Sequence, residues 1–204
     1  MKTSTPLLFT LLVLLSPVCV AAEPSPAPAA ATPAPKDNDE VAALYVEDQA
    51  DRQPPAGKSI DWKIVQPRDQ ARQKRVMELY AAGELKTGKD YYHAGMILQH
   101  GDKPEDYLLC HELCVAAVFK AGRSERASWL PSARWLAAAS EDRFLLSIGR
   151  AQRFGTQFSG EGENPHWTLD KMESGVTDEL RKAWSVPTLA QAKEREAEMN
   201  AKKE

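Results

Sequence analysis

The sequence predicts a mainly α-helical domain, built of antiparallel helical hairpins with a small β-hairpin appended near its C-terminal end. Two observations predict the helices: apolar residues recur at helical spacing in segments of moderate length, and short polar connections rich in glycine and proline separate these segments. A third observation predicts the β-hairpin, because apolar and polar residues alternate on both sides of the turn-rich segment SGEGENP, 159–165.

Residues 1–22 have the features of a secretory signal peptide. Lys2 is followed by an apolar run over 7–15, which is too short to span a membrane, and small residues precede Ala22. We expect cleavage after Ala22 and a periplasmic or secreted protein. Lipid modification of Cys19 is the less favoured alternative, because Pro17 and Val18 are poor neighbours for a modified cysteine.

The segment 23–35 alternates proline and alanine and contains no large apolar residue. Such a segment cannot bury a core, so it is predicted to be an extended linker. The remaining residues, 36–204, are enough for one ordinary domain.

Charge and composition exclude several classes of function. The chain of 204 residues has a net charge of −3 and no long run of Lys and Arg, so nucleic acid is not an expected partner. No stretch is long and apolar enough to span a membrane. The sequence also lacks a phosphate-binding loop and a nucleophile elbow, and no cofactor is predicted.

The first three helices are predicted from their start signals. Asp37, Asn38 or Asp39 can cap a helix over 37–51. Pro67 is expected to open the second helix, which ends near Ala82, and the segment 60–66 before it is expected to be extended. The charged stretch 68–75 is expected to be solvated. Thr87 and Asp90 have the spacing of a capping box for a helix that ends near His100.

The later elements follow the same signals. Pro104 starts a helix that ends at Ala121, and Pro131 starts one that ends near Ser147. Strands are predicted over 153–158 and 166–170. Thr177 caps a short helix to Trp184, and Thr188 with Gln191 caps a last, almost entirely polar helix over 189–202, which is expected to fray.

The helix over 131–147 is apolar nearly all round, which is typical of a central, buried helix. It nevertheless contains Asp142 and Arg143, and charges on a buried helix must be paired or reach an opening. One interpretation is a buried ion pair between these two residues. The other is a binding site, because polar side chains follow in a loop anchored on a rigid helix: Gln152, Thr156 and Gln157.

Cys110 and Cys114 lie four residues apart in a helical pattern, so their side chains run side by side and a disulfide is not expected. The segment CHELC, 110–114, could contribute zinc ligands if His93 or His100 completed the set. The favoured interpretation is that both cysteines are small core residues, because the spacing matches no known zinc motif, and no metal site is predicted.

Three segments, LQHGDKPEDY, EDRFLLSIGRAQRFGTQF and TDELRKAWSVPTLAQA, together resemble an uncharacterised bacterial domain-of-unknown-function family. Its marks are a Gln-His in a helix, a later Asp-Arg, and a Gly-x-x-Gln-x-Tyr/Phe-Gly-Thr-Gln signature. The resemblance covers about 90–195 and names no reaction. It implies functional roles for Gln99, His100, Asp142, Arg143, Gln152, Gly155, Thr156 and Gln157.

The sequence therefore predicts an exported domain that binds a polar ligand or a protein partner through the Asp-Arg and Gly-Thr-Gln surface. One alternative is a hydrolase-like or transferase-like enzyme, with His100 as acid/base, Asp142 orienting it, and Arg143 or Gln157 holding an oxygen of the substrate. A second alternative is a helical scaffold or interaction protein.

Overall fold

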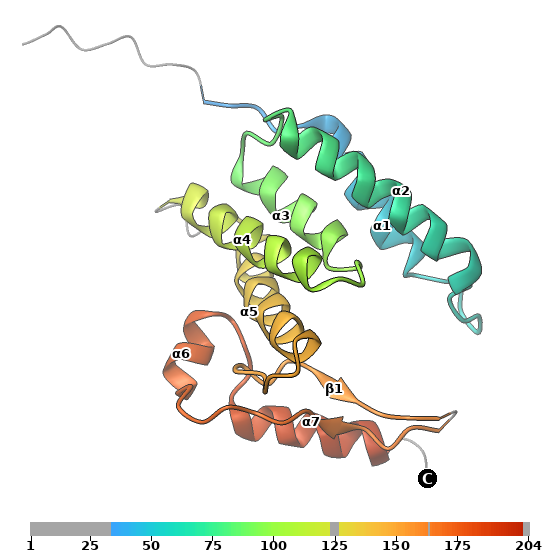
Figure 1. The fold of residues 1–204 in the computed structure, drawn as a ribbon, viewed down its shortest axis with the longest axis vertical. Coiled ribbons are helices and arrows are strands. Elements are labelled where there is room, and N and C mark those ends of the chain that lie inside the picture. Colours follow the sequence, from blue (N-terminus) through green and yellow to red (C-terminus); the bar gives the residue numbers. More distant parts are fainter. Residues whose placement is uncertain (1–33, 123–126, 163, 202–204) are drawn as a thin grey trace, which may run out of the picture. The chain divides into compact units, whose positions relative to one another are not determined.

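The computed structural model describes residues 34–122, 127–162 and 164–201, and this part of the chain forms seven α-helices and one two-stranded sheet (Figure 1). The description below concerns the compact unit Pro35–Glu204. The predicted signal peptide and the predicted linker up to residue 33 lie outside the described residues. The mainly α-helical fold with a small β-hairpin is confirmed.

The elements follow one another with short connections, and their bounds are α1 (Asp39–Asp51), α2 (Trp62–Ala81), α3 (Gly88–Leu98), α4 (Pro104–Ala121), α5 (Leu130–Ser147), β1 (Phe158–Ser159), β2 (Thr168–Leu169), α6 (Asp178–Ala183) and α7 (Leu189–Ala201). In Figure 1 the ribbon of α5 runs from α3 and α4 toward the C-terminal segment that contains β1, α6 and α7. Because α5 packs on α4 and also precedes the hairpin, it is the element that connects the two ends of this unit.

The predicted helix caps are present. The side chain of Asn38 accepts hydrogen bonds from the N–H of Glu40 and Val41, at 2.9 and 3.1 Å. Thr87 and Asp90 form the reciprocal capping box at the start of α3. Asp90 also accepts from the N–H of Asn38 at 2.8 Å, so one carboxylate fixes the starts of α1 and α3 together.

The start of α2 differs from the prediction. Asp61 caps this helix by accepting from the N–H of Lys63 at 3.0 Å, and α2 begins at Trp62. Residues 60–66 are therefore largely helical, and Pro67 lies inside the helix, where it cannot donate to the carbonyl of Lys63. Burial of Val65 against the domain outweighs the local preference of the proline.

Cys110 and Cys114 are free and fully buried, as predicted, in the core that α3, α4 and α5 share with α1 and α2. They pack under Gly95 of α3, where a Cβ atom would lie 2.8 Å from the sulfur of Cys114. Only glycine allows α3 and α4 to approach so closely at this point.

The β-hairpin is shorter than predicted. Each strand has two residues, with Phe158 paired to Leu169 and Ser159 to Thr168 in antiparallel register. The preceding residues, 153–157, are not a strand, because side chains and not a neighbouring strand take their amides, as described below.

The last helix is held more firmly than its polar sequence suggests. Glu196 of α7 accepts from the N–H of Leu169 at 3.0 Å. Asn200 accepts from the N–H of Trp167 at 2.8 Å and donates to its carbonyl at 2.9 Å. The helix extends to Ala201, and its polar side chains hydrogen-bond to the backbone of the hairpin; the expectation that it frays stays a prediction.

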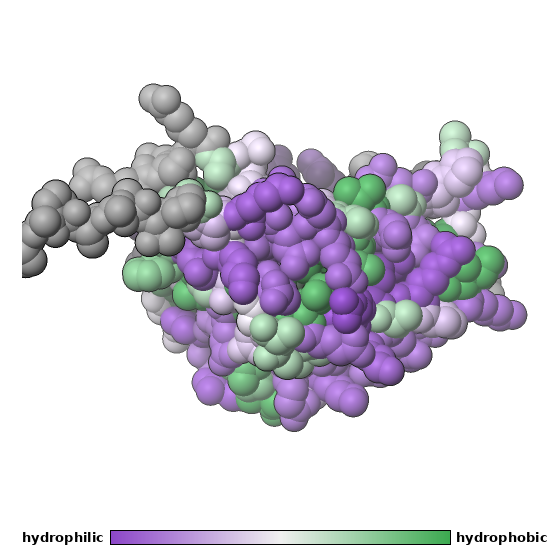
Figure 2. Space-filling model, turned by 90° about the horizontal axis from the view of Figure 1, so that it is seen from above, coloured by the Kyte–Doolittle hydropathy of each residue, from purple (hydrophilic) through white to green (hydrophobic). Residues whose placement is uncertain are grey.

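Figure 2 shows one face of the molecule, on which hydrophobic residues form small patches between hydrophilic ones. Among the described residues, no helix is long and apolar enough to cross a membrane.

Candidate ligand-binding site

Asp142 of α5 is fully buried and holds the segment that follows the helix. Its two carboxylate oxygens accept from the backbone N–H of Arg153, Phe154 and Thr156, at 2.7, 2.8 and 3.0 Å, and from the hydroxyl of Thr156 at 2.8 Å. A carboxylate can accept about four hydrogen bonds, so these four donors fill its capacity. Asp142 is therefore a fixed template for the path of residues 152–157, which we call the 152–157 loop.

Gln152, also fully buried, closes the same loop on itself. Its amide nitrogen donates to the carbonyls of Gln157 and Asp170, at 3.0 and 2.9 Å, while its amide oxygen accepts from the N–H of Gln157 at 3.0 Å. These bonds replace the strand pairing that the alternating sequence predicted. They also tie the loop to the chain next to β2.

Arg181 of α6 holds the loop from its carbonyl side. This guanidinium is 2 % exposed and donates to the carbonyls of Phe154 and Arg153. Gly155 follows these two residues with a φ of +73°, and a Cβ there would lie 3.0 Å from the sulfur of Met172. The glycine of the Gly-Thr-Gln element thus has a local structural cause, because its positive φ favours glycine and a Cβ atom would crowd the side chain of Met172.

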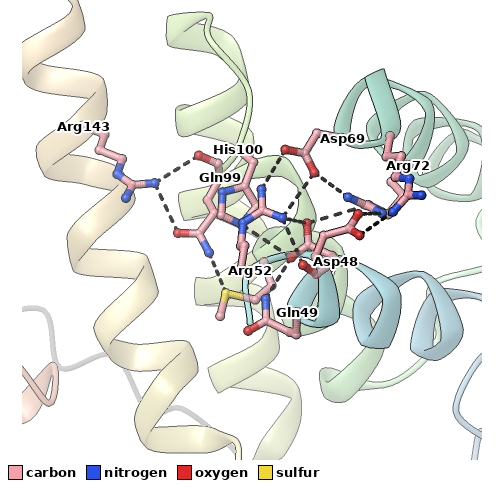
Figure 3. Close-up of polar contacts among 11 residues, drawn as sticks. Asp48, Gln49, Arg52, Asp69, Arg72, Gln99, His100 and Arg143 are labelled. Carbon is pink, nitrogen blue, oxygen red and sulfur yellow. Dashed lines mark hydrogen bonds and ion pairs between the residues drawn. The ribbon is translucent and has the colours of Figure 1, made fainter. Parts of the chain in front are cut away.

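Arg143 does not pair with Asp142, so the expected ion pair between these neighbours is wrong. Consecutive residues on a helix point in different directions, and Arg143 reaches Gln99 and Gln157 instead. It donates to the carbonyl of Gln99 at 3.0 Å and to the side-chain oxygens of Gln99 and Gln157 at 3.2 and 3.1 Å (Figure 3 shows the contacts with Gln99). The cation thereby caps the C-terminal end of α3.

Gln157 uses both ends of its side chain within the protein. Its oxygen accepts from Arg143, and its nitrogen donates to the hydroxyl of Thr156 at 2.9 Å and to the carbonyl of Ala139 at 3.5 Å. The structure therefore does bring Gln99, Arg143, Thr156 and Gln157 together. It joins them by bonds to one another, which leaves few of their polar groups for a ligand.

His100 lies in a different environment from Asp142. Its Nε2 is 3.5 Å from Asp48 of α1 and has no hydrogen-bond partner among the described residues. Asp48 belongs to a cluster of charged side chains between α1 and α2, in which Arg52 bonds to Asp48 and Asp69 at 3.0 and 2.8 Å (Figure 3). The predicted pairing of His100 with Asp142 is therefore wrong, since all four hydrogen bonds to Asp142 come from the 152–157 loop.

The charged stretch of α2 is also less solvated than predicted. Asp69 and Arg72 are buried, at 7 and 5 % exposure, and bond to each other at 2.6 Å. Burial would raise the pKa of Asp51, but hydrogen bonds from Arg72 and Arg68 outweigh it and hold this pKa below its ordinary value. Three aspartates and three arginines balance in this cluster, which we call the α1–α2 charge cluster: Asp48, Asp51, Asp69, Arg52, Arg68 and Arg72.

The remaining histidines and cysteines considered for zinc have structural contacts. The ring of His93 stacks on Tyr45 with centroids 4.1 Å apart, and burial lowers its pKa to about 4. Nδ1 of His111 lies 2.8 Å from the carbonyl oxygen of Ala137, which links α4 to α5. No group of three or more His, Cys, Asp or Glu side chains within the described ranges is placed to hold a metal ion.

The outer side of the 152–157 loop lines a pocket of about 480 Å³, which we call the Trp135 pocket. Its walls come from α5, from the loop and hairpin, and from α7, and the lining residues are Trp135, Gly155, Thr156, Gln157, Phe158, Trp167, Pro187, Gln191, Ala192, Arg195 and Met199. Three of them are aromatic. The pocket thus includes part of the predicted surface, but most of its groups come from elsewhere.

Sequence reasoning missed the contribution of α7 to this pocket. Gln191, Arg195 and Met199 recur every four residues, so they share one face of the helix. Their spacing was visible in the sequence. It could not be assigned to a site, because nothing local indicates that this polar helix lies against Trp135 and the hairpin.

Comparison of the chain with models of known protein families, with curated proteins and with solved structures finds no match. The resemblance to an uncharacterised bacterial family therefore stays a prediction.

Proposed function

We propose that the protein is an exported binding protein whose Trp135 pocket takes a small polar ligand with a flat apolar part. The observation that carries the proposal is the pocket itself, since about 480 Å³ lies within the range typical of small-molecule sites. Aromatic walls supply a stacking surface for a ring, while Gln191 and Arg195 supply polar groups at the same pocket. Export follows from the signal peptide predicted over residues 1–22.

The position of the pocket on a rigid support favours the same proposal. The 152–157 loop is fixed from behind by Asp142, Gln152 and Arg181, and its outer side lines the pocket. A wall held in one conformation loses little conformational entropy when a ligand binds. In this proposal the Asp-Arg and Gly-Thr-Gln residues shape the site, and most of the direct contacts come from α5 and α7.

The enzyme alternative finds no support in this geometry. It required Asp142 to orient His100, whereas His100 lies beside Asp48 and the acceptors of Asp142 are occupied by the loop. A helical scaffold remains the broader alternative, and no particular contact favours it.

A screen of small polar ring compounds by thermal shift tests the proposal, followed by titration of each hit into two variants. Trp135→Ala removes a wall of the pocket. Trp62→Ala is the matched control, because Trp62 is an exposed tryptophan of α2 that does not line the pocket. We expect hits whose melting shift disappears in Trp135→Ala and is kept in Trp62→Ala. Hits that bind both variants like the unmodified protein would exclude the Trp135 pocket as the binding site.

A further inference from the structure

The described residues that line the Trp135 pocket include a positive charge and no negative charge. Arg195 is the only charged side chain among the described residues that line it, and none of these lining residues is an acid. The cation also has no carboxylate within ion-pair distance in the part of the chain that the structure describes. Its neighbour on α7, Glu196, faces the hairpin instead, where it accepts from the N–H of Leu169.

An unpaired arginine in a pocket has a defined chemical preference. The guanidinium stays charged at all ordinary pH values and presents a planar fork of N–H donors, which matches the two oxygens of a carboxylate. A ligand carboxylate would meet attraction at Arg195 and no opposing acid among the described lining residues.

The other walls select for a ring. Trp135 and Phe158 line the same pocket as Arg195, and aromatic faces bind flat rings by stacking. Trp135 is 36 % exposed although it belongs to the central helix α5, so its indole is available at the pocket.

From these observations we infer that the ligand of the Trp135 pocket carries a carboxylate beside a flat ring, with the carboxylate at Arg195 and the ring against Trp135 and Phe158. The inference rests on the proposed function, since it names the chemical class of the ligand for that same pocket. A free aromatic acid and a peptide that ends in an aromatic residue both present this chemistry.

The test uses a pair of probes that differ in charge alone. 3-Phenylpropionate and 3-phenylpropionamide have the same ring and chain, and ligand-detected NMR measures their binding to the full protein at millimolar concentrations. We expect the acid to bind at least about tenfold more tightly than the amide. A peptide with a free C-terminal phenylalanine, compared with its C-terminal amide, separates the peptide source from the free acid.

Two variants of α7, one at the pocket and one away from it, complete the test. Arg195→Gln removes the charge from the pocket, while Lys193→Gln removes the same charge from an exposed position of α7 outside it. The acid should bind Arg195→Gln about as weakly as the amide, the amide should be unaffected, and Lys193→Gln should behave like the unmodified protein toward both probes.

The outcomes separate the inference from the proposed function. If acid and amide bind equally and Arg195→Gln changes neither, while Trp135→Ala weakens both, the pocket binds ring compounds and the carboxylate inference is wrong. If no probe binds, or if binding survives both Trp135→Ala and Arg195→Gln, the proposed function falls and the carboxylate inference falls with it.

Discussion

Asp142 and Asp48 are both fully buried carboxylates on helices, yet they are satisfied by different kinds of donor. Asp142 accepts from three backbone N–H groups and a hydroxyl of the 152–157 loop, whereas Asp48 faces side chains: Gln49, Arg52 and His100. A backbone N–H cannot move without the chain that contains it. Asp142 therefore determines the path of a loop, while Asp48 contributes charge to a cluster whose long side chains can adjust.

The two regions therefore have different roles: one determines the shape of a pocket, and the other holds two helices together. The loop at Asp142 forms a wall of the Trp135 pocket, so an error of position there changes the shape of a site. The α1–α2 charge cluster holds two helices together, and two of its three arginines, Arg52 and Arg72, bond to two carboxylates each. Removing one partner from such a cluster leaves the others with partners.

The largest expected effect compares Asp142→Asn with Asp48→Asn. The asparagine at 142 would place an NH₂ group opposite backbone N–H donors and leave buried donors without acceptors, so we expect the free energy of unfolding to fall by about 3–5 kcal/mol. Asp48→Asn should lower it by about 1–3 kcal/mol, because Arg52 and Arg72 keep Asp69. Urea unfolding of both variants measures this, and equal losses would remove the distinction between the two regions.

A smaller effect concerns the pH dependence of the free energy of unfolding, and it comes from His93 of α3. Burial lowers the pKa of His93 to about 4, so the unfolded chain binds a proton more readily than the folded one between about pH 6.5 and pH 4. Stability should therefore fall as the pH falls through this window, by on the order of 1–2 kcal/mol from this residue.

His93→Phe keeps a ring against Tyr45 and cannot bind a proton, so its stability should depend less on pH in that window. Denaturant unfolding at pH 7 and pH 4.5 provides the measurement. His166→Gln is the control, since His166 is exposed near the hairpin. The prediction fails if both variants lose as much stability on acidification as the unmodified protein.

The smallest expected effect concerns Gln157. The sequence alone suggests an exposed amide whose removal would change stability by no more than about 0.5 kcal/mol. Its bonds to Arg143, Thr156 and Ala139 raise the expected loss for Gln157→Ala to about 1–2 kcal/mol, or a few degrees in melting temperature. Gln70→Ala, at an exposed position of α2, should leave the melting temperature unchanged. A Gln157→Ala variant as stable as the Gln70 control would mean that the loop does not depend on this amide.

The features that sequence analysis predicted correctly are local. Asn38, Thr87 with Asp90, Pro104 and Thr177 start helices as expected, because a cap depends on residues three or four positions away. The burial of the two cysteines followed from their spacing. Most of the candidate residues of the C-terminal half meet around the 152–157 loop, and their role in binding stays a prediction.

The features that could not be predicted depend on long-range contacts. Which carboxylate lies beside His100 is decided by the packing of α1 against α3, and no local pattern contains that information. The early start of α2 at Trp62 depends on the burial of Val65, which outweighs the start signal of Pro67. The face of α7 that reaches the pocket was likewise invisible, because the partner surface comes from α5 and the hairpin.

The two bonds between Asn200 and the backbone of Trp167 resemble the way in which one strand bonds to the next, and Glu196 adds a third at Leu169. An unpaired strand edge is a template on which other chains can pair and aggregate. Helix α7 occupies that edge of β2 with its side chains, so the short hairpin offers less backbone to a neighbouring molecule. The polar C-terminal helix thereby covers an edge at which another chain could pair, in addition to forming one side of a pocket.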